Sequence, residues 1–314
     1  MPRRKLFKFR LTRKQKNGIV VSVAMALCTL GIFWILARPV ATPKAIKHTR
    51  HQIPVTTSKR VVPPRPSLFS PVAIPSRIAP KPAGTMPRRF ASQPKITVVI
   101  DDIGYHLRDR DRLAALSDKV TYAILPLLPY SRYFGNLSRT TGAEIILHLP
   151  LDTTQDKVPG RGLIVDTMTP EDILAMLARD LDSVPNHVGV NNHMGSRGTA
   201  NRAMMTIILK DLKQRGLFFL DSYTTPDSVV PSVAREIGLP FLARGIFLDN
   251  EDSKPAILAQ LKQLRQVARE KGNAVAIGHY RTNTLEVLAS EIPAMEDEGF
   301  LIITLQEMLE IQRD

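Results

Sequence analysis

The sequence contains a single cysteine, Cys28, in 314 residues. One cysteine excludes an intramolecular disulfide and any zinc site built from cysteine pairs. The folded part of the chain must therefore be held together by its hydrophobic core. Roughly 220 residues follow the first third of the chain, and a segment of that length is large enough to bury such a core.

Acidic residues are absent from the first 95 positions, which carry 20 of the 43 Lys and Arg residues. The remaining 219 residues hold 23 basic and all 29 acidic side chains, so their net charge is −6. The overall charge of +14 therefore belongs to the N-terminal third. A nucleic-acid-binding domain needs a basic face of its own, so we expect no nucleic-acid partner.

Long hydrophobic runs are lacking except at residues 18–37, which contain no charged side chain. Twenty residues in a helix span about 30 Å, the thickness of the hydrocarbon core of a bilayer. Residues 1–17 contain eight Lys and Arg residues, and a positive flank of this kind stays in the cytoplasm. We predict a single-pass anchor in the inner membrane that places the C-terminal domain in the periplasm. The alternative is a cleaved signal peptide.

Residues 38–94 contain twelve prolines and no acidic residue. Prolines at this density disfavour helix and sheet and favour an extended spacer of about 3.1 Å per residue. We therefore predict a disordered, basic stalk. The predicted organisation is a basic cytoplasmic tail (1–17), a transmembrane anchor (18–37), a Pro-rich stalk (38–94) and one folded domain (95–314).

Short β-rich runs alternate with amphipathic stretches through the predicted folded domain. The runs occupy residues 96–100, 120–125, 144–149, 188–192, 217–221, 245–249, 274–278 and 300–305. Two of the intervening helices have clear starts, at Thr169 and at Ser253, each followed closely by a proline. Strict alternation of strands and helices predicts an α/β fold with a parallel sheet, either a reduced or distorted barrel or an open doubly wound sheet.

The helix expected after Ser253 has apolar residues at helical spacing, which predict one buried face. These residues are Ile257, Leu258, Leu261, Leu264 and Val267. A glycine-rich phosphate loop is lacking after the first strand, which instead runs into the sequence Asp-Asp-Ile-Gly at 101–104. This absence removes the usual reason to predict nucleotide binding.

Polar residues follow the ends of six of the predicted strands. Because the carboxyl ends of parallel strands meet at one edge of a sheet, we expect these side chains to gather on one rim. Two histidines and an aspartate on such a rim are typical ligands of a hydrolytic divalent metal. The residues at these positions are Asp101, Asp102, His148, Asn191, Asn192, His193, Asp221, Ser222, Asp249, Asn250 and His279.

The ordered motifs ITVVIDDIG, EIILHLPLD, VNNHMGS, LDSYTT, FLDN and AIGH resemble the divergent polysaccharide deacetylase family. The resemblance covers essentially the whole of the predicted folded domain. It implies a distorted (β/α) barrel of about seven strands and metal-assisted removal of acetyl groups from N-acetylated sugars. By the same resemblance, Asp101 is the catalytic base, Asp102 and His148 are metal ligands, and His279 is the general acid.

The sequence departs from the better-known deacetylases at position 152, where an aspartate replaces the expected second metal histidine. We assign the missing ligand to His193, which follows the next strand, and keep Asp152 as a second candidate. Zinc is the first expectation for two histidines and a carboxylate, although nickel, cobalt, iron or manganese also fit such a site.

Further rim residues have two interpretations each. Asn191, Asn192, Asp221, Asp249 and Asn250 are candidates to bind substrate hydroxyls or to hold the metal histidines in place. Asp221 is equally expected to cap the turn that follows it. Ser222 belongs to the same group but lacks the G-x-S-x-G surroundings of a nucleophilic serine.

These features predict a metal-dependent hydrolase of C–N bonds that deacetylates an envelope carbohydrate such as peptidoglycan. Two alternatives remain open at the level of sequence. One is a non-catalytic binding or scaffold module that keeps the deacetylase fold. The other is a metal-dependent hydrolase of a different amide or ester.

Overall fold

The computed structural model describes residues 93–312. The predicted tail (1–17), anchor (18–37) and most of the stalk (38–94) lie outside the described residues and stay predictions. Within 93–312, no helix is both long enough and apolar enough to cross a membrane. The first strand of the described residues begins at Lys95.

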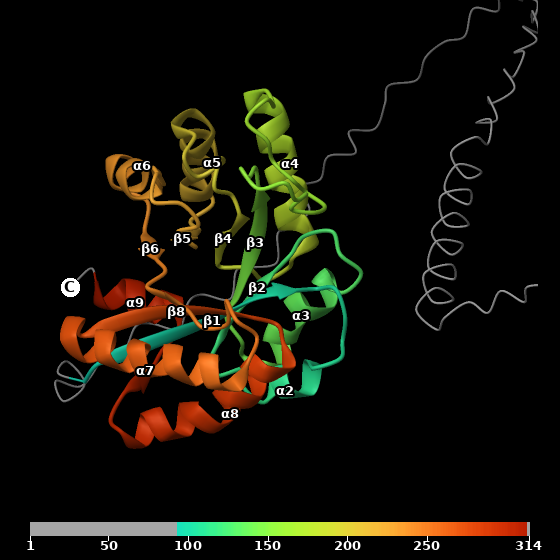
Figure 1. Ribbon diagram of the computed structural model, residues 1–314. Coiled ribbons are helices and arrows are strands. Elements are labelled where there is room, and N and C mark those ends of the chain that lie inside the picture. The colour runs from blue at the N-terminus through green and yellow to red at the C-terminus, as the bar shows by residue number, and fades with distance from the viewer. Residues whose placement is uncertain (1–92, 313–314) are drawn as a thin grey trace, which may run out of the picture. The chain divides into compact units, whose positions relative to one another are not determined.

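The described residues form one sheet in which every strand pair is parallel (Figure 1). The strand order is β6-β5-β4-β3-β2-β1-β8-β7, and β9 pairs with β1. The sheet curls into a half-barrel with β6 and β7 at the ends of the order. The strands are β1 (Lys95–Ile103), β2 (Thr121–Ile124), β3 (Ile145–Leu151), β4 (Gly189–Met194), β5 (Phe218–Asp221), β6 (Phe241–Ala243), β7 (Ile246–Phe247), β8 (Asn273–His279) and β9 (Leu301–Ile302).

The predicted parallel α/β fold is confirmed, but the strand count of about seven is wrong for the described residues, which contain nine. The two-residue strands β7 and β9 lie within the predicted β-rich runs at 245–249 and 300–305. The strand that matches no predicted run is β6, whose three residues are too few to show a period-two pattern.

Eight helices are described, and most connect consecutive strands. In Figure 1, α4, α5 and α6 lie alongside β3 to β6, and α7 and α8 lie alongside β1 and β8. The helices are α2 (Arg110–Ala114), α3 (Ser131–Thr141), α4 (Pro170–Ser183), α5 (Arg202–Gln214), α6 (Val230–Ile237), α7 (Lys254–Lys271), α8 (Thr282–Asp297) and α9 (Leu305–Ile311).

Both helix starts predicted from the sequence are confirmed. The side chains of Thr169 and Ser253 accept hydrogen bonds from backbone N–H groups in the first turns of α4 and α7. The predicted apolar face of α7 needs one correction. Ile257 is buried, but Leu258 is 42% exposed, because it lies at the edge of the apolar stripe rather than on it.

The sheet separates two hydrophobic clusters. Along β1, Val98 and Ile100 belong to the larger cluster, which the connecting helices cover, whereas Val99 belongs to the smaller cluster inside the half-barrel. The inner cluster also contains Leu305 and Met308 of α9. Alternate side chains of each strand therefore face opposite sides, as the pleat of a strand requires.

Helix α9 fills the amino-terminal end of the half-barrel. Its first backbone N–H groups, at Leu305 and Gln306, donate to the carboxylate of Glu144, which directly precedes β3. Thr121, at the start of β2, donates its hydroxyl to the same carboxylate. The opposite, carboxyl-terminal end of the inner face is thus left for polar side chains.

Candidate functional site

The acidic pair at the end of β1 lies at the centre of the rim. Asp101 is 2% exposed and continues the inward-facing row of Val99. Asp102 has a φ of +64°, and the register of β1 against β2 shifts between Ile100 and Ile103. This irregularity breaks the alternation of the strand, so that two consecutive carboxylates approach the same histidine.

That histidine is His148 of β3. Its Nε2 lies 3.6 Å from Asp101 Oδ2 and 3.4 Å from Asp102 Oδ1. Its Nδ1 lies 2.9 Å from Asn191 Oδ1, and the amide of Asn191 donates to Asp101 Oδ1 at 2.9 Å. Because Asn191 offers an acceptor to Nδ1, the proton is held there and the lone pair of Nε2 faces the two carboxylates.

His193 of β4 completes a compact group with Asp102 and His148. Its Nδ1 lies 3.2 Å from Asp102 Oδ1 and 3.0 Å from His148 Nε2. One ligand atom from each of the three residues lies within 4.8 Å of the others. Asp102 lies on β1, His148 on β3 and His193 on β4. These strands are close in the sheet, because only β2 separates β1 from β3, and β4 pairs with β3.

The chemistry of this group fits a divalent metal. Asp102 Oδ1 is buried and has no hydrogen-bond partner in the described part of the protein. A buried carboxylate oxygen without a donor is costly unless a cation satisfies it. Two imidazole nitrogens and one carboxylate oxygen are ligands that zinc and similar metals accept, with room for further ligands.

The ionisable groups of the rim shift one another's pKa values. Burial opposes ionisation of Asp102, yet the neighbouring His148 and His193 hold the pKa of its carboxyl well below the ordinary value. Burial raises the pKa of Asp101 despite the opposing effect of His148 and His279. The two adjacent carboxyls thus have pKa values shifted in opposite directions, an arrangement suited to separate roles.

His279 ends β8 directly beside Asp101, its partner in the β1–β8 register. Asp249 holds it twice, because the carboxylate accepts from the His279 backbone N–H at 2.8 Å and contacts its Nδ1 at 2.7 Å. Thr284 donates its hydroxyl to the same carboxylate. Burial alone would lower the pKa of His279, but Asp249 outweighs it and raises this pKa above the ordinary value.

Two other residues singled out in the sequence, Asp221 and Asn192, hydrogen-bond to residues in or beside the neighbouring loops. Asp221 is fully buried and accepts hydrogen bonds from the Tyr223 backbone N–H and the Ser228 hydroxyl, which is the turn-capping interpretation. Asn192 binds backbone groups of Met194 and Ser222.

Three further rim residues differ in how closely they approach the centre. The hydroxyl of Ser222 accepts from Asn191 at 3.3 Å, so this serine contacts the residue that orients His148. Asn250 is exposed on the rim. Asp152, the second candidate ligand, lies outside the compact group, and its carboxylate lies 3.7 Å from the guanidinium of Arg197.

Sequence reasoning missed Arg244 and Phe247. The Arg244 guanidinium lies 3.9 Å from the centre of the Phe247 ring, and that ring stacks on His279 at 6.0 Å. Arg244 also donates to the backbone carbonyls of Ser222 and Tyr223. Arg244 lies between β6 and β7, and Phe247 lies inside the predicted run 245–249, so neither residue follows a predicted strand end.

A parallel α/β half-barrel whose rim gathers an acidic pair and histidines around one metal-sized position defines a protein of the polysaccharide deacetylase-like class. Residues 98–309 match the family described as divergent polysaccharide deacetylase. The chain belongs to this family.

The relatives and neighbours agree with this assignment. The chain is 34% identical over 212 residues to an uncharacterised protein of Haemophilus influenzae, an alignment that covers 67% of this chain and 75% of the relative. It is 30% identical over 194 residues to the uncharacterised protein YibQ of Escherichia coli, covering 62% and 61%. A crystal structure of an uncharacterised Agrobacterium tumefaciens protein matches with a TM-score of 0.66 at 21% identity, covering 70% of this chain and 93% of that one.

Proposed function

We propose that the domain is a metal-dependent hydrolase that removes the acetyl group from an N-acetylated envelope carbohydrate such as peptidoglycan. The observation that carries the proposal is the grouping of Asp102, His148 and His193, in which two imidazole nitrogens lie within 3.4 Å of the buried Asp102 Oδ1. Asp101 and His279 flank this group in register on neighbouring strands, where a base and an acid are needed.

Asp102, His148 and His193 would hold one divalent metal, for which zinc is the first expectation, and the bound metal would polarise the acetyl carbonyl and acidify water. Asp101, whose raised pKa suits a proton acceptor, takes the proton of the attacking water. His279, kept protonated by Asp249, donates a proton to the nitrogen of the leaving amine. Asn191 keeps His148 and Asp101 in place through its amide.

The proposal includes the setting in which the reaction occurs. Residues 18–37 would anchor the chain in the inner membrane, and the basic, proline-rich residues 38–94 would hold the domain in the periplasm near its glycan. The support for this setting is the hydrophobic and charge pattern of the sequence.

Metal content and acetate release from the purified full-length chain test the proposal. We expect about one metal per chain, and its loss in both His148→Ala and His193→Ala variants, because three protein ligands are the minimum for such a site. Acetate release from N-acetylglucosamine oligomers or peptidoglycan fragments is expected to disappear in parallel.

His187→Ala is the matched control, since His187 binds the Val184 carbonyl away from the rim. This variant is expected to keep both the metal and the activity. A folded wild-type chain that binds no metal would overturn the mechanism. A metal-loaded chain that releases no acetate from glycans would instead point to the scaffold alternative or to a different amide or ester.

A further inference from the structure

The half-barrel is open on one side, between the two strands at the ends of its sheet. Among residues 93–312, β6 pairs with β5 and β7 pairs with β8, but β6 and β7 do not pair with each other. Only Arg244 and Gly245 separate these two strands in the chain. His279 lies on β8, near the β7 end of the strand order, whereas His193 lies on β4, nearer the β6 end. The relative placement of the two histidines therefore depends partly on what spans the open side.

The side chain of Arg244 bridges this open side. Its Nε donates to the Ser222 carbonyl at 2.7 Å, and its Nη2 donates to the Tyr223 carbonyl at 2.9 Å. Both carbonyls belong to the loop that follows β5, on the β6 side of the opening. The same guanidinium lies 3.9 Å from the centre of the Phe247 ring, which belongs to β7 on the other side. One side chain thus contacts both ends of the sheet.

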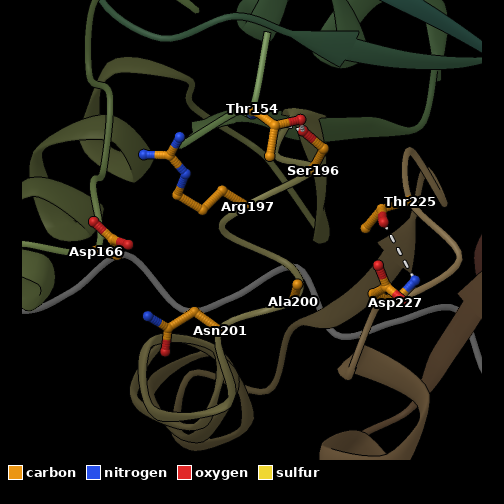
Figure 2. A pocket seen from close by; sticks show the side chains of 8 residues that line it. All are labelled: Thr154, Asp166, Ser196, Arg197, Ala200, Asn201, Thr225 and Asp227. Atoms are coloured by element: carbon orange, nitrogen blue, oxygen red, sulfur yellow. Dashed lines mark hydrogen bonds between the residues drawn. The ribbon is translucent and has the colours of Figure 1, made fainter.

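The loop after β5 is a firm support for these contacts. The backbone N–H groups of Ser222 and Tyr223 both donate to buried side chains at the ends of β4 and β5. Further along the loop, the Thr225 hydroxyl accepts from the Asp227 backbone N–H, as Figure 2 shows at the edge of a surface hollow. Because the loop is held by its own hydrogen bonds, its carbonyls are fixed in the positions that Arg244 needs.

The Phe247 ring connects this bridge to the proposed acid. Its centre lies 6.0 Å from the centre of the His279 ring, and the two planes are 15° apart. Asp249 contacts the imidazole at one atom, Nδ1. A hydrogen bond to one ring atom leaves the tilt of the ring soft, whereas a stacked neighbour restrains its plane. Nε2, from which the proton would leave, moves with that tilt.

Arginine suits this position better than any other cation. Its guanidinium is planar, so one face can lie on an aromatic ring while two of its nitrogens donate in the same plane to separate acceptors. Arg244 is half-buried, and burial strengthens both the hydrogen bonds and the attraction between the cation and the ring. An ammonium group lacks the plane that makes these contacts together. The substitution Arg244→Lys therefore keeps the charge and removes the bridge.

We propose that Arg244 is a positioning residue for the reaction at the metal group, because it spans the open side of the half-barrel and holds the plane of the His279 ring through Phe247. The inference rests on the proposed function, in which His279 donates the proton to the leaving amine. It adds that the acid needs two supports. Asp249 fixes its charge and one ring atom, and the Arg244–Phe247 pair fixes its tilt. Arg244 acts through these groups and exchanges no proton itself.

Two substrates that differ in their need for an acid test this role in the full-length chain. An N-acetylglucosamine tetramer releases a basic amine that must be protonated, whereas p-nitrophenyl acetate releases a weakly basic phenolate that leaves without a proton. In Arg244→Lys we expect kcat for the tetramer to fall about ten- to hundredfold, because a small displacement of a catalytic group has an effect of this size. The KM for the tetramer, the metal content and the metal-dependent rate on p-nitrophenyl acetate are expected to stay within about twofold of wild type.

Phe247→Leu keeps an apolar side chain but removes the ring, so it is expected to have the same effect as Arg244→Lys. Because both residues act on one imidazole, the double variant should be within about twofold of the slower single variant, instead of showing the product of the two losses. Arg235→Lys is the matched control. The Arg235 guanidinium lies 5.3 Å from the centre of the Phe241 ring, at the start of β6 and away from the rim, so this variant should keep the wild-type rates on both substrates.

Three results of these assays would overturn the inference. Equal losses of kcat on the two substrates, or loss of the metal, would show that Arg244 only stabilises the fold. An unchanged kcat for the tetramer would show that the placement of His279 does not depend on Arg244.

NMR spectra of the full-length chain with labelled histidine separate this inference from the proposed function. Replacing the Phe247 ring by leucine removes its ring current from His279, so the His279 signal, identified by its absence in His279→Gln, moves. We expect Arg244→Lys to move this signal in the same direction and Arg235→Lys to leave it in place. This shift, in a chain that releases acetate from neither substrate, would sink the proposed function and keep the restraint of His279 by Arg244. A His279 signal that stays in place in Arg244→Lys overturns the positioning role, whether or not acetate is released.

Discussion

The carboxylate of Asp249 controls the protonation of His279 by contacting both its ring and its backbone N–H. One oxygen lies 2.7 Å from the ring Nδ1, and the other accepts from the His279 backbone N–H and the Thr284 hydroxyl. Burial opposes ionisation of Asp249, but these donors lower the pKa of its carboxyl. An ionised Asp249 in turn raises the pKa of His279, so the histidine keeps its proton to higher pH.

Asp249→Asn is expected to move the alkaline limb of the pH profile of kcat/KM to lower pH. The amide removes the negative charge that raises the pKa of His279, so the general acid loses its proton earlier as the pH rises. The measurement is acetate release across a pH series, together with metal content, which we expect to remain unchanged. Asn250→Ala, at the exposed neighbour, serves as control, and an unshifted limb in Asp249→Asn would argue against His279 as the acid.

The position of the central residues was predictable, because Asp101, Asp102 and His148 lie toward the carboxyl ends of strands that share one edge. Their roles stay predictions. The pairing of Asp249 with His279 was not predictable, since it depends on β7 lying beside β8. The sequence offered Asp249 only as one polar residue among several at strand ends. The left-handed backbone of Asp102 was not predictable either, because aspartate, although enriched in this conformation, adopts it only rarely.

At the scale of elements, the seven-residue helix α9 closes one end of the half-barrel. Its buried side chains complete the cluster inside the half-barrel, together with Val99, Ile146 and Leu220 from three different strands. Its amino-terminal end is held by the capping box of Thr304 and Glu307 and by Glu144. The helix therefore seals the end of the sheet opposite the polar rim.

Met308→Ala is expected to lower the free energy of unfolding by about 2–5 kcal/mol, the usual cost of truncating a fully buried methionine. Urea denaturation of the full-length chain, followed by a signal of the folded domain, measures the change. Glu310→Ala, at an exposed position of the same helix, is the control and should stay within about 0.5 kcal/mol of wild type. A cost for Met308→Ala as small as the control's would contradict the sealing role of α9.

The longer elements were predictable because each satisfies a local rule. β1, β3 and β8 are runs of β-branched and aliphatic residues, and α4 and α7 begin with a capping residue and a proline. Of the short strands, β7 and β9 lie within predicted runs, whereas β6 was not predictable, because its three residues form a strand only through their neighbours in the sheet. Leu258 was misassigned for a related reason, since spacing alone does not define the width of a buried stripe.

At the scale of the whole domain, one buried acidic side chain lowers the stability of the fold. Asp180 in α4 is fully buried, and neither carboxylate oxygen has a hydrogen-bond partner among the described residues. It packs against Gly162, where any Cβ atom would lie 2.3 Å from its Oδ1. Burial raises the pKa of Asp180 to about 8, despite the opposing effect of Arg179.

This pKa predicts how stability changes with pH. An unfolded aspartate titrates near ~3.9, so the folded state binds the extra proton between about pH 4 and pH 8. The contribution of Asp180 to stability is therefore fully present below pH 4, declines through this window and is lost above pH 8. Asp180→Asn removes this decline, because the amide does not titrate.

Thermal unfolding at pH 5 and pH 9 measures the effect. We expect the melting temperature of wild type to fall by several degrees more than that of Asp180→Asn between the two values. Asp182→Asn, at an exposed site of the same helix, should follow wild type. An Asp180→Asn variant with the pH dependence of wild type would show that Asp180 is ionised in the folded protein.

The topology of β1 has a consequence for how the domain forms. Among residues 93–312, β1 is the first strand, and its partners include β8 along its whole inner length and β9 at its start. During synthesis β8 is made long after β1, so the nascent chain carries one long, apolar, unpaired edge of β1 until then. Pairings so distant in sequence also close slowly. The sheet of the described residues is therefore completed only after β8 and β9 have been made, and loss of these two strands would leave β1 with β2 as its one partner strand.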